Sequence, residues 1–339
     1  MSLLDNASIV WPLGAQTKAG NLAAWNPQTK STVPFDVVRA TPKQRINEAS
    51  EWEEVAANVL ARDFTSGGCG DFTLEPERKF LFLNSATGVT QNITVVSGRD
   101  YAVSFSGTGS ITFSVGATGT LTGSGATALD RVSSIVTTTG TSVTCTVSGT
   151  VQYVNIEINT NDSSVTYPTS WMKTLGSIVT RNADVPSLTG AGALLGNSEG
   201  GLFIEALAFA FDGAFSLGEA TLTSTNRLAF RWTAAGNRAS LFINVGGVGQ
   251  VGIDTPVSSV FPNIFYKIAL GYATNDVKIY INGVDSGSDT SATMFADDTL
   301  TDIRFTTETG ALPFYGRIRQ FIVFNQRPTD TQLDLVSTP

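Results

Sequence analysis

The sequence contains no histidine, only two cysteines and few charged residues. Of its 339 residues 15% are charged, against ~25% in an ordinary globular domain. Without histidine there is no Ser-His or Cys-His catalytic pair and no histidine metal ligand. Two cysteines cannot complete a four-ligand zinc site or a disulfide-dense scaffold. These absences remove many enzymatic functions before any motif is considered.

Basic residues and long apolar runs are also scarce. Lys and Arg number 21 against 29 Asp and Glu, a net charge of −8, and an acidic chain disfavours nucleic acid as a partner. The longest apolar run, Ala206 to Phe211, is far shorter than the ~20 residues of a membrane helix. The N-terminal segment MSLLDNASIVW carries Asp5 where a signal peptide is apolar. We therefore expect synthesis in a cytosol and no membrane insertion.

The two cysteines occupy different patterns. Cys69 follows a glycine pair and is expected in a turn, whereas Cys145 alternates with Val143 and Val147 and is expected inside. A disulfide between Cys69 and Cys145 is possible, but synthesis in a reducing compartment favours two free thiols.

What is present divides the chain into three parts. Residues 1–62 have four scattered prolines and no sustained periodicity before Asn47, which is typical of an irregular arm. After Asn47 apolar residues recur at helical spacing, which predicts a helix over residues 47–62. These apolar residues are Trp52, Val55, Ala56, Val59 and Leu60.

Residues 63–167 alternate between apolar and polar side chains and are interrupted by many glycines. Short strands with frequent turn signals predict a β-sandwich or barrel. The apolar parity shifts from Val151 and Tyr153 to Val154 and Ile156, and a β-bulge produces such a shift.

Residues 168–339 are also rich in alternating strands. Asn282-Gly283 predicts a tight hairpin turn, and Pro328-Thr329-Asp330 predicts the start of a short terminal helix. We expect Leu333, Leu335 and Val336 on the inner side of that helix.

Two segments of this third part resemble a known family. FYKIALGYATNDVKIYINGVDSGSDT resembles the central hairpin of concanavalin A-like and laminin-G-like lectin domains, and FYGRIRQFIVFNQRPTDTQLDLV resembles their closing strand and terminal helix. The match spreads over residues 198–337. It implies a jelly-roll fold but not one function, because the fold hosts lectins, glucanases and structural modules.

The upstream segments resemble a module of tailed-phage structural proteins. FDVVRATPKQRINEASEWEEVAANVLARDFTSGGCGDFTLEPERKFLFLNS is followed by QNITVVSGRDYAVSFSGTGSITF and then WMKTLGSIVTRNADVPSLTG. In the proteins it resembles, this string precedes a lectin-like domain. The resemblance implies an extended Glu51–Phe64, so helix and extended chain both stay open here, with the extended form favoured.

We therefore predict an all-β protein of two consecutive β-sandwich, jelly-roll-like domains preceded by an irregular N-terminal arm. The arm spans residues 1–62, and a carbohydrate-binding-module-like sandwich spans 63–167. A concanavalin A-like or laminin-G-like jelly roll with a short C-terminal helix spans 168–339.

Paired carboxylates are the catalytic option, because glycoside hydrolysis needs two acids ~5–10 Å apart. The Glu-x-Asp-x-x-Glu pattern of the glucanases that share this fold is absent. Glu75 and Glu77 have i, i+2 spacing, but Pro76 points to an edge or turn, and Asp297-Asp298 lies in a loop-like stretch. A solvated acidic surface is the simpler interpretation, and we expect no catalysis and no required cofactor.

Calcium is the one cofactor that the sequence leaves possible, because loop carboxylates suit it. The candidates lie in predicted turns, with no EF-hand spacing, and aspartate is also an ordinary turn residue. They are Asp254, Asp276, Asp285, Asp289 and Asp297.

Lectins bind sugars with an exposed aromatic ring and nearby polar groups. Trp232, Tyr272 and Tyr315 are candidate platforms, with Asn275 and Asp276 as rim partners. Trp232 and Tyr272 also fit core positions of their strands, and for each candidate core packing is the more frequent role.

The order of modules implies a virion protein: a tail or head fibre, or a decoration protein. We expect a non-enzymatic adhesin on the virion surface that docks on other virion proteins through its N-terminal arm and binds host cell-surface polysaccharide. A homo-oligomer is expected, with a trimer as the first possibility. The alternatives are a purely structural virion component and a glycan depolymerase using Glu75, Glu77 or Glu205.

Overall fold

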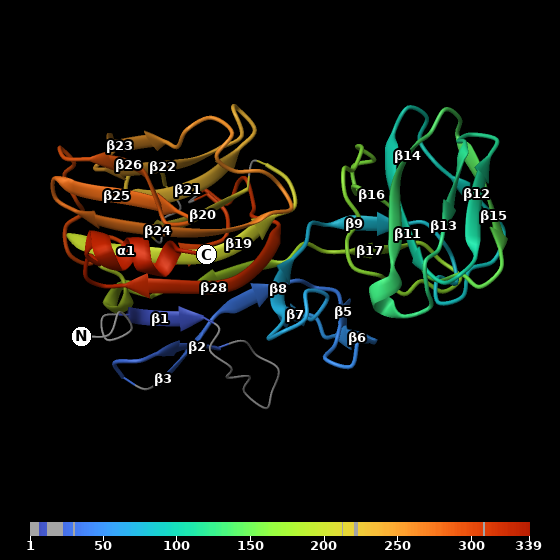
Figure 1. Ribbon diagram of the computed structural model, residues 1–339, viewed down its shortest axis with the longest axis horizontal. Helices are drawn as coiled ribbons and strands as arrows, with labels where there is room; N and C mark the ends of the chain where they lie inside the picture. Colours follow the sequence, from blue (N-terminus) through green and yellow to red (C-terminus); the bar gives the residue numbers. More distant parts are fainter. Residues whose placement is uncertain (1–6, 12–22, 30, 212, 220–222, 308) are drawn as a thin grey trace. The chain divides into compact units, whose positions relative to one another are not determined.

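The protein is built almost entirely of β-strands. The computed structural model describes residues 7–11, 23–29, 31–211, 213–219, 223–307 and 309–339, as strands β1 to β28 with one α-helix, α1 (Figure 1). The predicted all-β class is therefore confirmed. In this part of the chain no helix is long and apolar enough to cross a membrane.

The chain folds into two compact units whose limits differ from the predicted boundaries at residues 62 and 167. Unit 1 combines Met1–Val37 with Val185–Pro339, and unit 2 is Val38–Asp184. The first 62 residues supply strands to both units: β1 (Ala7–Trp11) pairs with β28 (Gly316–Phe324) in unit 1. Pairing across more than 300 residues leaves no local signal in the sequence.

Residues 47–62 contain no helix, and strands occupy Trp52–Val55 and Ala61–Asp63 within the Glu51–Phe64 segment that the resemblance implies to be extended. In unit 2, β6 (Trp52–Val55) pairs antiparallel with β5 (Lys43–Ile46). The Asn47 side chain accepts hydrogen bonds from the backbone amides of Ala49 and Glu51, both at 3.0 Å, and thereby closes the hairpin turn. The helical spacing of the apolar residues is overridden by this pairing.

Unit 2 is a two-layer β-sandwich beside that hairpin. One sheet has the strand order β14-β11-β16-β9-β17 and the other β10-β15-β12-β13. The strands of the first sheet are β9 (Arg78–Phe80), β11 (Asp100–Ser106), β14 (Val132–Thr137), β16 (Gln152–Ile158) and β17 (Val179–Arg181). Those of the second are β10 (Gln91–Thr94), β12 (Ser110–Ser114), β13 (Gly119–Thr122) and β15 (Ser142–Ser148), and the short pair β7 (Ala61–Asp63) and β8 (Asp71–Leu74) precedes both sheets.

The predicted bulge is present in β16. The register of β16 with β11 shifts between Ser104 and Ser106, and both Val151 and Val154 are buried despite their odd spacing. Tyr153 lies within the shift and has φ of 54°, a conformation that bulky side chains rarely adopt. The bulge lets apolar residues on both sides of Tyr153 face the core.

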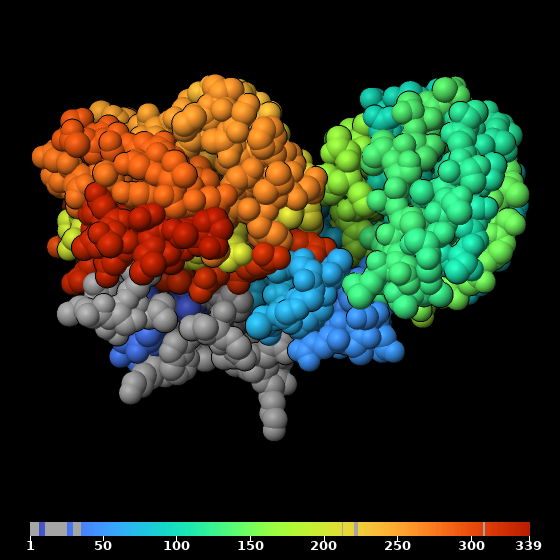
Figure 2. All heavy atoms as spheres, in the orientation of Figure 1, coloured from blue at the N-terminus to red at the C-terminus, as the bar shows by residue number. Residues whose placement is uncertain are grey.

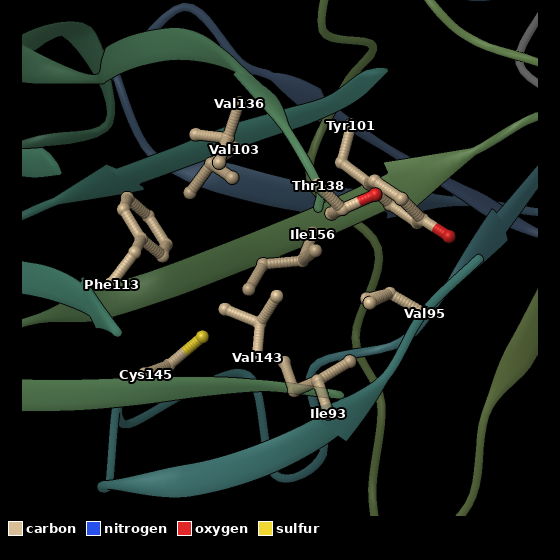
Figure 3. A pocket seen from close by; sticks show the side chains of 10 residues that line it. All are labelled: Ile93, Val95, Tyr101, Val103, Phe113, Val136, Thr138, Val143, Cys145 and Ile156. Atoms are coloured by element: carbon tan, nitrogen blue, oxygen red, sulfur yellow. The ribbon is translucent and has the colours of Figure 1, made fainter. Parts of the chain in front are cut away.

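The core of unit 2 encloses a small cavity of about 10 Å³. Side chains from both sheets converge on it, and the sulfur of Cys145 points into this interior (Figure 3). The Tyr101 hydroxyl oxygen accepts a 2.7 Å hydrogen bond from the backbone amide of Val96. Both cysteines are free, Cys145 buried as predicted and Cys69 exposed, so no disulfide links them.

Thiol labelling is expected to separate the two cysteines. Burial raises the pKa of Cys145 to about 12, so its thiol stays protonated and shielded at pH 8, whereas the thiolate is the reactive form. An aromatic disulfide reagent should therefore titrate Cys69 alone in the folded protein and both thiols in guanidinium chloride. Rapid native labelling of Cys145 would contradict its place in the core.

Unit 1 is a second two-layer sandwich. One layer, named here the helix-covered sheet, has the order β26-β25-β24-β19-β28-β1-β2-β3, and the opposite sheet has the order β23-β22-β21-β20-β27-β18-β4. The helix-covered sheet contains, besides β1 and β28, β2 (Ala23–Asn26), β3 (Ser31–Pro34), β19 (Glu199–Ala208), β24 (Phe265–Ala273), β25 (Asp276–Ile281) and β26 (Val284–Asp289). The opposite sheet contains β4 (Asp36–Val38), β18 (Val185–Leu188), β20 (Ala214–Gly218), β21 (Arg227–Thr233), β22 (Arg238–Val245), β23 (Val248–Asp254) and β27 (Asp302–Arg304).

Helix α1 (Asp330–Ser337) packs on β24 and β25 of the helix-covered sheet (Figure 1). The red C-terminal atoms cover this side of unit 1 in Figure 2. Thr329 caps the helix as the sequence predicts, and Leu333 is fully buried with Val336 packed nearby. Leu335, however, is 73% exposed. The prediction for Leu335 was wrong because residues two apart point to opposite sides of a helix.

Candidate functional site

Two of the predicted sugar platforms are core residues. Trp232 and Tyr272 are both 0% exposed. Trp232 lies between the two sheets, with its ring centroid 4.9 Å from that of Phe230 and 5.0 Å from that of Phe314. The Tyr272 hydroxyl donates a 2.6 Å hydrogen bond to the carbonyl of Gly196, and burial raises its pKa. A ring with no exposed face cannot stack on a sugar, so core packing is the role that the structure gives to both.

The other predicted residues are distributed over separate surfaces. Asn275, with φ of 57°, forms the turn between β24 and β25, and Asp276 accepts a 2.7 Å hydrogen bond from Arg327. Tyr315 lines a hollow of about 350 Å³ together with Arg304 and Pro313, and neither Asn275 nor Asp276 lines this hollow. The structure therefore does not assemble these residues into one site.

The candidate catalytic acids are held in structural contacts. Glu75 is 2% exposed and lies 3.1 Å from Arg181 and 3.3 Å from Lys43. Burial alone would raise the pKa of Glu75, but the two cations and donors from Ser170 outweigh it and hold that pKa far below its usual range. Glu75 is thus enclosed and ionised, the opposite of an accessible general acid with a raised pKa.

Glu77 and Glu205 also have partners. Glu77 accepts hydrogen bonds from Thr160 at 2.5 Å and Asn182 at 3.2 Å, and Glu205 pairs with Arg319 at 3.2 Å. In the described ranges no three His, Cys, Asp or Glu side chains lie together as metal ligands. Most of the calcium candidates instead bind nearby side chains or turn amides: Asp254 with Arg238, Asp276 with Arg327, Asp285 with Lys278, and Asp289 with Ser291.

The outer face of the opposite sheet carries a polar set that the sequence did not single out. On β21, Leu228, Phe230 and Trp232 point inward. The alternate residues of β21, including Arg231, therefore point outward.

Cross-strand pairing places Ser240 of β22 beside Arg231, and Asp254 of β23 beside Ser240. Two residues further along β22, Phe242 is paired with the small residues Ala229 and Gly252.

These residues line a surface hollow of about 410 Å³, named here the arginine hollow. At its rim, Gly236 has φ of +78°, and a Cβ there would approach the Arg238 guanidinium to 2.8 Å. The lining residues are Arg231, Thr233, Ala235, Gly236, Arg238, Ser240, Phe242 and Asp254.

The arginine hollow has an excess of positive charge. Asp254 accepts hydrogen bonds from Ser240 at 2.5 Å and Arg238 at 3.3 Å. Arg231 lies over the Phe242 ring, 5.7 Å from its centroid. Within the part of the chain that the structure describes, Arg231 makes no hydrogen bond or ion pair, and its Nε is buried without a partner. Two guanidinium groups thus face one carboxylate, and one of them is available to a ligand.

Sequence reasoning missed this site because an outward arginine on a strand is indistinguishable from an ordinary solvated residue. The available signal was the alternation itself: the positions that face away from Leu228 and Phe230 carry Arg227, Ala229 and Arg231. Only the strand register brings Arg231 next to Ser240 and Phe242.

Comparisons with known proteins give distant structural similarities. No family model matches the chain, and no curated protein matches it. The CBM40 module of the Ruminococcus gnavus IT-sialidase, bound to α2,3-sialyllactose, is 20% identical over 44% of this chain and 87% of that one, with a TM-score of 0.38. Domain 4 of AbnA, a GH43 extracellular arabinanase from Geobacillus stearothermophilus in complex with arabinotriose, is 13% identical over 52% of this chain and 84% of that one, with a TM-score of 0.39. Similarities this distant assign no ligand to the chain.

Proposed function

We propose that the protein is a non-enzymatic carbohydrate-binding protein and that the arginine hollow binds an acidic glycan. The observation that carries the proposal is the Arg231 guanidinium, which pairs with no acid among the described residues and is held over the Phe242 ring on the outer face of a sheet. A planar guanidinium matches a carboxylate in a two-bond geometry, which a sugar acid offers and a neutral sugar does not.

The neighbouring groups suit the rest of a sugar ring. Phe242 offers an apolar surface, while Ser240, Thr233 and Asp254 offer oxygen atoms for hydroxyl groups. The ion pair with Arg238 neutralises part of the negative charge of Asp254. Arg231 then gives the hollow a net positive potential, which attracts an anion. The enclosed, ion-paired state of Glu75 supports binding without cleavage.

The biological setting of this proposal rests on the sequence resemblance. The order of the segments beginning FDVVRATPKQ, QNITVVSGRD and WMKTLGSIVT resembles tailed-phage structural proteins. We therefore place the protein on a virion surface, facing a host polysaccharide. Mass spectrometry of purified particles tests this placement, and absence of the chain from the particles would remove it.

Binding of acidic saccharides is expected to depend on Arg231. Colominic acid and oligogalacturonate, two polymers of sugar acids, serve as probes in calorimetry with the purified chain. The Arg231→Gln variant, which keeps most of the side-chain volume, should bind at least about tenfold more weakly, because a charge-assisted pair contributes ~1.5–3 kcal/mol.

The matched control is Arg99→Gln, which removes the same charge from an exposed residue of unit 2. Equal losses for both variants would show that net charge alone drives binding and would refute the site. Neither polymer should be shortened on incubation with the protein, and release of oligosaccharides would overturn the non-enzymatic part.

A further inference from the structure

A further hollow, of about 650 Å³, lies in unit 2 and is named here the tryptophan hollow. The turn of the β5–β6 hairpin forms one wall, and the short 3-10 helix η2 (Ala128–Asp130) forms another. Its volume lies within the ~300–1,000 Å³ that small-molecule sites occupy. Its lining includes Ser50, Glu51, Trp52, Thr127, Leu129 and Tyr153.

Aromatic rings form the base of this hollow. The Trp52 and Tyr153 centroids are 6.3 Å apart, and the buried Trp171 ring packs beneath both, 5.9 Å from Trp52 and 4.9 Å from Tyr153. The Arg131 guanidinium lies 5.7 Å from the Trp52 centroid and donates a hydrogen bond to the carbonyl of Thr169 at 2.6 Å. The two partly exposed rings are therefore fixed from below.

Two energetically unfavourable features lie at the base of the hollow: a strained backbone and a buried polar atom. Tyr153 adopts a left-handed backbone conformation at the bulge, and bulky residues in that region persist only where the surroundings enforce them. The Trp52 Nε1 is buried with no hydrogen-bond partner among the described residues. Strained backbone and buried polar atoms without hydrogen-bond partners are enriched at functional sites. Their presence here therefore favours a function for this hollow.

The rim is rigid and carries polar groups with no partner. The Thr127 hydroxyl donates a 2.7 Å hydrogen bond to the Asp130 carboxylate across η2. The Asn47 side chain fixes the turn of the β5–β6 hairpin on the other wall. The Ser50 hydroxyl and the Glu51 carboxylate make no hydrogen bond or ion pair within the described residues. Glu51 and Asp130 are both acidic, and the Arg131 guanidinium is held against the Trp52 ring and the Thr169 carbonyl. The rim therefore repels anions.

We propose that the tryptophan hollow is a second saccharide site and that it takes a neutral pyranose. The sugar's apolar face would stack on the Trp52 and Tyr153 rings, and its hydroxyl groups would donate to the Glu51 carboxylate. This selectivity is opposite to that of the arginine hollow, where the charge favours an acid. The inference is independent of the proposed function, because no residue is shared by the two hollows.

The test uses the full-length protein and the methyl glycosides of glucose, galactose, mannose and N-acetylglucosamine as probes. Saturation-transfer NMR should detect millimolar binding of at least one of them to the wild type. Glu51→Gln should weaken that binding about tenfold, as expected for loss of a charged hydrogen-bond acceptor. Leu129→Trp, at a side chain that is 46% exposed on η2, should abolish binding by filling the hollow.

Two controls keep the outcome decisive. Glu48→Gln removes the same charge from an exposed residue of the same hairpin that does not line the hollow, and it should bind like the wild type. Arg231→Gln should also retain neutral-sugar binding, whatever it does to acidic polymers. The proposal is overturned if no methyl glycoside binds the wild type at tens of millimolar, or if Glu51→Gln and Leu129→Trp bind as well as Glu48→Gln.

Discussion

An Asp184→Asn variant is expected to lose about 3–5 kcal/mol of unfolding free energy in unit 2, because it removes one partner of a buried ion pair and leaves the other partner charged and buried. Asp184 is fully enclosed, with one carboxylate oxygen 2.5 Å from Arg39 and the other 2.7 Å from Lys43. Removing its charge leaves Arg39 with no carboxylate partner among the described residues. It also leaves Lys43 to share Glu75 with Arg181. Guanidinium unfolding, with hydrogen exchange to identify the transition of residues 38–184, measures the loss.

The matched control is Asp162→Asn. Asp162 pairs with Lys79 at 2.6 Å, but its side chain is 47% exposed, so water replaces the lost contact. Exposed pairs contribute ~0–1 kcal/mol, and the control should therefore change stability by less than about 1 kcal/mol. Equal effects of the two variants would contradict the structural role of the buried network.

The buried network explains how unit 2 is closed on itself. Arg39 and Lys43 come from the start of this unit, and Asp184 is its last residue. The backbone amide of Glu75 also donates to Asp184 at 2.9 Å. One carboxylate thus joins segments that are more than 100 residues apart in the sequence, which is why its replacement affects the whole unit.

Local alternation was enough to predict the two sandwiches and the bulge. The buried residues on either side of Tyr153, and the left-handed Asn282 and Gly283 of the predicted hairpin turn, follow from rules that act over a few residues. The β5–β6 hairpin was ambiguous because Trp52 and Val55 fit both a helical stripe and a strand. Tertiary pairing resolved it, and the sequence resemblance pointed the same way.

The candidate sites could not be predicted in the same way. The arginine hollow depends on the register between β21 and β22, which sets Arg231 beside Ser240. The tryptophan hollow depends on a turn near residue 50 meeting η2 near residue 128. Alternation assigns a side chain to the inside or the outside of a sheet, but it does not say which outside residues become neighbours.

Replacement of Trp232 by alanine is expected to cost about 3–5 kcal/mol of unfolding free energy in unit 1, as for other large aromatic residues removed from a core. The ring is fully buried among Phe230, Phe314 and Phe215, with centroid distances of 4.9, 5.0 and 6.3 Å. Thermal or guanidinium unfolding, followed by hydrogen exchange of residues 185–339, measures the loss. Acidic-glycan binding should fall only by the fraction of protein that is unfolded.

Trp232→Phe separates packing from any direct contact with a sugar. The Trp232 Nε1 has no hydrogen-bond partner among the described residues, so phenylalanine removes a buried donor whose desolvation costs ~1–3 kcal/mol. That gain offsets part of the lost ring volume, and we expect a net change below about 1.5 kcal/mol with unchanged binding, as for other near-conservative core substitutions. A Trp232→Ala protein as stable as the wild type but unable to bind glycan would instead make Trp232 a ligand residue. It would require the opposite sheet to open on binding, because no face of the ring is exposed in this structure.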